Sequence, residues 1–202
     1  MYQKTDQILK ILKTNQQRIF SRYKALIKPG FDSLNVIKRS KEMYKLLEEQ
    51  NENAFLEIAK KTYREVNPQG EPPTDKDWLL SILVAYDIVT KYVYKHEIER
   101  KRARFAESLI ATQKKQQEFS TASNLLWKQT AQYAITVTDE ALMQAYIDTG
   151  VKKVRWIIER DSKVCPVCRA RRNKIYPIKS APKKTHYHCR CYYEAVREGD
   201  EE

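Results

Sequence analysis

No glycine or proline occurs between Pro73 and Gly150. These two residue types interrupt helices most strongly, because glycine loses the most conformational entropy on folding and proline removes a backbone donor. The 202-residue chain holds only four glycines and seven prolines, gathered at residues 29–30, at residues 68–73 and from residue 150 onward. This distribution predicts long helices before Gly150 and argues against a turn-rich β-sandwich.

Apolar residues recur at helical spacing in the same part of the chain. The clearest stripe alternates spacings of three and four residues, which places its members on one face of a helix. Its members are Leu79, Ile82, Tyr86, Val89 and Val93. Weaker stripes at residues 8–23 and 34–59 predict two preceding helices.

Capping residues predict where some helices begin and end. Thr74 or Asp75 is placed to cap the helix that carries the clearest stripe. Thr138 is placed to begin a separate short helix, and Gly150 follows at the position where a helix C-cap glycine is expected.

The chain changes character after Gly150. Residues 151–159 read VKKVRWIIE, and their β-branched residues and Trp156 predict a strand. Residues 151–197 hold 14 Lys and Arg against three acidic residues, whereas the whole chain has a net charge of +12. The positive charge is therefore concentrated in the C-terminal part.

These observations predict a mainly α protein in three parts. A long-helix N-terminal body spans residues 1–134, and a small α+β module rich in cysteine and histidine spans residues 135–197. The last five residues, 198–202, form an acidic tail. Four cysteines confined to the module exclude a disulfide framework that holds the whole chain together.

Six potential metal ligands lie within 27 residues of the module: Cys165, Cys168, His186, His188, Cys189 and Cys191. The CxxC pair places two thiols on one turn, and His186-x-x-Cys189 repeats the pair spacing with one imidazole. Structural zinc is bound by four nitrogen or sulfur ligands in a tetrahedron. The spacing predicts zinc bound by Cys165, Cys168, His186 and Cys189, with Cys191 as the first substitute and His188 as a further spare.

Three other interpretations of the cysteines stay open. The thiols can be small buried residues without a ligand. The CxxC can be a redox pair, although such pairs sit at a strand-to-helix turn of a βαβ unit. A disulfide of the Cys165–Cys191 kind is compatible with an oxidising environment.

The order of residues in the module resembles the C-terminal signature of the phage head morphogenesis family, the Mu protein F-like minor head proteins of tailed bacteriophages. The elements that carry the resemblance are Gly150, Trp156, Asp161, the Cys165-x-x-Cys168 pair, Pro182, His186 and Cys189-Arg190-Cys191. The resemblance covers residues 135–195. Asn173 stands in the hairpin where the family often has glycine, and asparagine tolerates the same left-handed turn. Tyr187 and His188 stand where the family commonly has proline and asparagine.

The resemblance implies a non-enzymatic minor component of the virion. Proteins of this family enter the procapsid in few copies and support head assembly, and some are thought to bind DNA. The implied partners are the portal and the major capsid or scaffold proteins, with residues 1–134 as the region of contact. The implied location is the interior of the phage head, after assembly in the host cytoplasm.

A basic surface is expected around the cysteine cluster, with tyrosines interleaved. Its residues are Arg169, Arg171, Arg172, Lys174, Lys183, Lys184 and Arg190. Such a surface can neutralise DNA phosphates, and without a base-reading helix the binding is expected to be independent of sequence and strongly salt-dependent. The other interpretation is a solvated face whose tyrosines pack the core of a small domain.

The main alternative function is a zinc-ribbon DNA-binding regulator. A ribbon normally closes with a second CxxC, whereas this chain closes with HxxCxC. A nuclease of the HNH type is a further alternative, and it needs a general-base histidine together with separate metal-binding residues. The chain has three histidines, at positions 96, 186 and 188, and no Asn or His follows Cys191. We therefore expect a protein that is not an enzyme.

The apolar pattern predicts neither a membrane-spanning segment nor a secretory signal. No apolar run approaches the roughly 20 residues that a membrane span needs. The first ten residues, MYQKTDQILK, lack the apolar stretch of a secretory signal.

Overall fold

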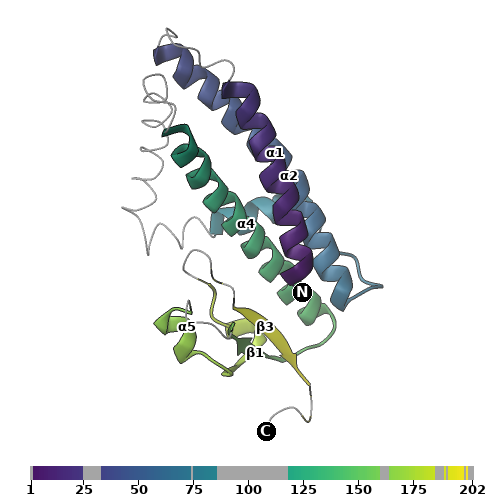
Figure 1. Cartoon of the computed structure of the whole chain (residues 1–202). Coiled ribbons are helices and arrows are strands. Elements are labelled where there is room, and N and C mark those ends of the chain that lie inside the picture. The colour runs from purple at the N-terminus through teal and green to yellow at the C-terminus, as the bar shows by residue number, and fades with distance from the viewer. Residues whose placement is uncertain are drawn as a thin grey trace.

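Three long helices form the body of the molecule in this computed structural model. They are α1 (Tyr2–Lys24), α2 (Ser33–Val66) and α4 (Glu118–Asp148), and they lie side by side along their length (Figure 1). The structure describes residues 2–24, 33–73, 75–85, 118–159, 164–184, 189, 191–197 and 199. A small sheet lies at the end of the body where α4 ends (Figure 1). The prediction of a mainly α protein with a small α+β C-terminal part is confirmed.

The core of the body is built from the predicted stripes. Its buried residues come from all three helices and from the helical residues 76–85, and they are Leu12, Phe55, Leu56, Ile58, Ala59, Leu79, Ile82, Ala134, Val137 and Ala141. Small side chains on α4, such as Ala134 and Ala141, allow the neighbouring helices to approach closely. Leu79 and Ile82 confirm the first part of the clearest stripe, whereas Tyr86, Val89 and Val93 lie outside the described residues.

One of the two helix N-caps predicted from the sequence is confirmed, and the other is wrong. The Asp75 carboxylate accepts a hydrogen bond of 2.5 Å from the backbone N–H of Trp78, which confirms Asp75 as a cap. The prediction that Thr138 begins a separate helix is wrong, because Thr138 lies inside α4. Its hydroxyl donates to the Ala134 carbonyl at 2.8 Å, so the side chain is satisfied within the helix instead of at an N-terminus.

Gly150 ends α4 in the way that its position predicts. Its φ of 80° is in the left-handed region, where a residue without Cβ carries no steric penalty. The Gly150 N–H donates to the Ile147 carbonyl at 3.0 Å, and the Val151 N–H donates to the Tyr146 carbonyl at 2.9 Å. This pair of bonds is a Schellman motif, and it turns the chain from α4 into the sheet.

The sheet has three antiparallel strands in the order β2-β1-β3. The central strand β1 (Lys153–Ile157) pairs with β2 (Ile175–Pro177) on one side and with β3 (Tyr192–Val196) on the other. The short helix α5 (Pro166–Ala170) lies between β1 and β2 in the chain, and the 3-10 turn η1 (Ile178–Ser180) follows β2. The predicted strand over residues 151–159 is therefore confirmed as β1.

A left-handed turn follows α5. Asn173 has a φ of 57°, and its N–H donates to the Trp156 carbonyl at 2.9 Å. Asparagine adopts this conformation more readily than most residues, as the sequence predicts.

The core of the C-terminal part includes the last turns of α4. Leu142 and Tyr146 of α4 are buried in one cluster with strand residues Val154, Trp156 and Tyr193. The helix therefore runs across the boundary predicted at residues 134 and 135 and contributes to both cores. None of the helices that the structure describes combines the length and the apolar composition needed to cross a membrane.

Candidate metal centre

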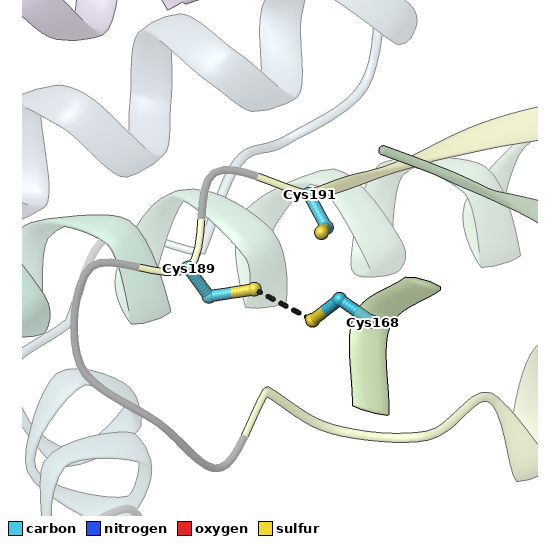
Figure 2. Close-up of side chains that lie close together, drawn as sticks. All are labelled: Cys168, Cys189 and Cys191. Atoms are coloured by element: carbon cyan, nitrogen blue, oxygen red, sulfur yellow. Dashed lines mark hydrogen bonds between the residues drawn. The ribbon is translucent and has the colours of Figure 1, made fainter. Parts of the chain in front are cut away.

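Three buried thiols lie close together in the core of the C-terminal part. The sulfur atoms of Cys168, Cys189 and Cys191 all lie within 4.8 Å of one another. Figure 2 shows Cys189 and Cys191 on the segment that leads into β3, with Cys168 facing them from α5, and the Cys168 and Cys189 sulfurs are 3.6 Å apart. All four cysteines of the chain are thiols, so the alternative of a Cys165–Cys191 disulfide is not adopted.

Local backbone geometry aims these thiols at one point. Cys165 is the N-cap of α5, its sulfur accepts a hydrogen bond of 3.3 Å from the Cys168 N–H, and proline follows at the first helical position. This turn points Cys168 into the protein. Cys189 and Cys191 lie two positions apart shortly before β3, and Figure 2 shows their side chains turned toward the same point. Both therefore face Cys168.

The donor set fits a metal ion. Zinc binds thiolates at about 2.3 Å, so the sulfurs of a tetrahedral site are about 3.8 Å apart. The 3.6 Å between Cys168 and Cys189 is close to that edge, and the other sulfur distances in the group need only a small contraction. Thiolates are soft ligands that suit zinc and similar metals. The three buried cysteines can hold a metal ion.

The pKa values of two of these thiols, Cys168 and Cys189, are raised when no cation is near. Burial, together with the charge of Cys189, raises the pKa of Cys168 to about 12. Hydrogen bonding with Cys191, together with burial, raises the pKa of Cys189. A bound divalent cation lowers the pKa of the thiols that coordinate it, because a coordinated thiol loses its proton.

The predicted ligands differ in where the structure places them. Cys168 and Cys189 are brought together as expected, and Cys191, expected only as a substitute, joins them. Cys165 lies beside this group, and its sulfur accepts a hydrogen bond from the Cys168 backbone N–H. His186 and His188 lie outside the described residues.

Two of the predicted phosphate-binding residues form ion pairs with α4. Lys184 is buried, and its Nζ lies 2.7 Å and 2.6 Å from the two carboxylate oxygens of Asp139 on α4. This burial corrects the prediction that Lys184 contacts DNA, because its ammonium is already paired away from solvent. Lys183 is exposed and lies 2.8 Å from Glu140 of α4.

The remaining basic residues divide into three groups. Arg171 stacks its guanidinium over the Trp156 ring, 5.1 Å from the ring centroid. Arg169, Arg172 and Lys174 are exposed around the end of α5, as expected for a basic surface. Arg190 lies outside the described residues.

The contacts of loop residues 182–184 with α4 were not predicted from the sequence. Asp139-Glu140 and Lys183-Lys184 are complementary in charge and in order, but no sequence rule pairs residues more than 40 positions apart. The same loop is held from the sheet, because the Tyr193 hydroxyl donates a hydrogen bond to the Pro182 carbonyl. Residues 182–184 are therefore fixed on both sides, directly before the segment that leads to Cys189.

Comparisons of the chain with models of known families, with curated proteins and with solved structures find no match.

Proposed function

We propose that this protein is a minor head protein of a tailed bacteriophage or prophage, and that it supports head assembly at the portal without catalysing a reaction. One observation supports this proposal more than any other. The described residues that carry the family resemblance belong to one structural unit. Gly150 ends α4, and Trp156, Cys168, Cys189 and Cys191 share one buried cluster. Residues that match a pattern by chance are not expected to converge in one core.

We propose that zinc is the ion held by the cysteines. The sheet is small, and domains of this size commonly need a metal or a disulfide because their core supplies little stability. Zinc has no redox chemistry of its own and binds thiolates tightly, so its binding energy becomes folding energy of the module.

The role of the centre is structural in this proposal. The three thiols are no more than 3% exposed, so the described part of the site is closed to solvent. Catalytic zinc sites keep one position open for water or substrate. The raised pKa of Cys168 also makes it a poor nucleophile in the absence of a cation, because the thiolate is the reactive form.

The exposed basic residues provide a second contact surface. Arg169, Arg172 and Lys174 surround the end of α5, next to the cysteine cluster. We infer that they contact packaged DNA through its phosphates, without reading its sequence. The helical body would then face the portal and the capsid or scaffold proteins, in the host cytoplasm during assembly and in the head interior afterwards.

Sedimentation tests the proposed function. The tagged full chain is produced in cells in which the parent phage is induced, and procapsids are separated from soluble protein on a gradient. The chain is expected to sediment with procapsids and to be recovered with the portal. A chain that stays at the top of the gradient and binds one duplex sequence selectively would be a zinc-ribbon regulator, and the head proposal would be abandoned.

A further inference from the structure

We propose that the metal centre is a four-thiolate site formed by Cys165, Cys168, Cys189 and Cys191, with no histidine ligand. This inference rests on the proposal that zinc is bound. It changes the ligand set expected from spacing, in which His186 was a ligand and Cys191 a substitute.

The four cysteines form two pairs that face each other. Cys165 and Cys168 belong to the turn that begins α5, and Cys189 and Cys191 lie shortly before β3. Cys168 and Cys189, one from each pair, are 3.6 Å apart. Two facing pairs supply the two opposite edges of a tetrahedron, which is the geometry that zinc requires.

Cys165 already has the environment of a thiolate ligand. Its sulfur accepts the backbone N–H of Cys168 at 3.3 Å, and N–H donors to sulfur stabilise the charge of a coordinated thiolate. The Cys165 sulfur is not among the three that lie within 4.8 Å of one another, so it has to turn toward the ion to complete the site; Cys165 is also less buried than the other three cysteines.

The surrounding charge suits a site with four thiolates. Four thiolates and one divalent cation carry a net charge of about −2, whereas a site with one histidine in place of a thiolate carries about −1. Residues 164–184 contain seven basic residues and no acidic one. Arg169, Arg171 and Arg172 follow Cys168 within four positions, which places positive charge next to the centre. Part of the basic surface therefore balances the metal centre in addition to any contact with DNA.

X-ray absorption at the zinc edge tests the ligand set in the full chain. The predicted result is a shell of four sulfur atoms at about 2.3 Å. A shell of three sulfurs and one nitrogen overturns this inference and leaves the zinc proposal intact. A chain without zinc overturns both, while the sedimentation experiment still tests the role in the phage head.

Single substitutions separate the candidate ligands. His186→Ala and His188→Ala are each expected to retain stoichiometric zinc with an unchanged sulfur shell. Cys165→Ser is expected to lose one sulfur from the shell or to lose zinc. Loss of zinc, or a changed shell, in the His186→Ala protein contradicts the four-thiolate assignment even if a cysteine variant fails to fold.

Discussion

Trp156 shows how a single residue organises the C-terminal module. Its side chain is fully buried, meets the Tyr193 ring edge-on at 5.3 Å and is covered by the Arg171 guanidinium. Its indole N–H is buried and has no hydrogen-bond partner among the residues that the structure describes. The apolar contacts therefore outweigh the cost of that donor.

Truncating this side chain is expected to destabilise the module strongly. Trp156→Ala should lower the free energy of unfolding by about 3–5 kcal/mol, because it leaves a large cavity in the core. Trp156→Phe should cost less, since it keeps an aromatic ring and removes the unpartnered N–H. Urea denaturation of the two variants and the wild type measures the difference, and equal stability of all three proteins would refute the burial argument.

Individual residues were predictable where a local rule decides their conformation. The CxxC turn, the left-handed Asn173 and the cap Asp75 follow from spacing and from local hydrogen bonding. The burial of Lys184 was not predictable, because it depends on an acidic partner, Asp139, on a helix distant in the sequence. Sequence shows that a side chain is charged, whereas only the fold shows where its counter-charge lies.

Helix α4 is the element on which the two cores depend. Its middle packs against α1 and α2, and its last turns support the sheet. Its length was underestimated because Thr138 has the side chain of an N-cap, and sequence does not distinguish a cap from a threonine that bonds back to the preceding turn. Its end was predicted correctly, because a glycine at a left-handed position is a strong local signal.

Substitution of Gly150 tests the end of α4. Gly150→Ala should lower the free energy of unfolding by about 1–2 kcal/mol, because an L-residue is strained in the left-handed region. No heavy atom in the described part of the chain lies within 4 Å of an added Cβ, so the cost is assigned to the backbone. Gly150→Asn is the matched control and should cost less, since asparagine tolerates this conformation. Thermal melts compare the variants, and an alanine variant as stable as the wild type would contradict the assigned strain.

The whole molecule is joined by two ion pairs of different kinds. Lys184 is buried and its partner Asp139 is largely shielded from solvent, whereas Lys183 is exposed and its partner Glu140 is partly exposed. Burial raises the pKa of Asp139, and the charge of Lys184 opposes that effect. The two pairs link the loop before the cysteine cluster to α4, the helix that contributes to both cores.

Removing each lysine should have a different effect on stability. Lys184→Met should cost about 3–5 kcal/mol, because it leaves a buried carboxylate without its counter-charge. Lys183→Met should cost less than about 1 kcal/mol, as is usual for an exposed pair. Chemical denaturation at neutral pH measures both variants, and equal losses would contradict the assigned difference in burial.

The loss in the Lys184→Met protein should also depend on pH. Without Lys184, the folded-state pKa of Asp139 lies further above its unfolded value, so the folded variant takes up a proton first as pH falls. The loss of stability relative to the wild type is therefore largest above that raised pKa, and it becomes smaller as the pH falls through it. A deficit that grows on acidification would show that Asp139 is not the group left unpaired.

The zinc content of the purified full chain tests the central claim that a metal ion organises the C-terminal module. The protein is prepared under reducing conditions without chelators, and the molar ratio of zinc to protein is measured by elemental analysis. The predicted result is about one zinc ion per chain, since the facing cysteine pairs form a single site. A folded, reduced chain that contains far less than one zinc ion and still keeps its three-stranded sheet would contradict the claim.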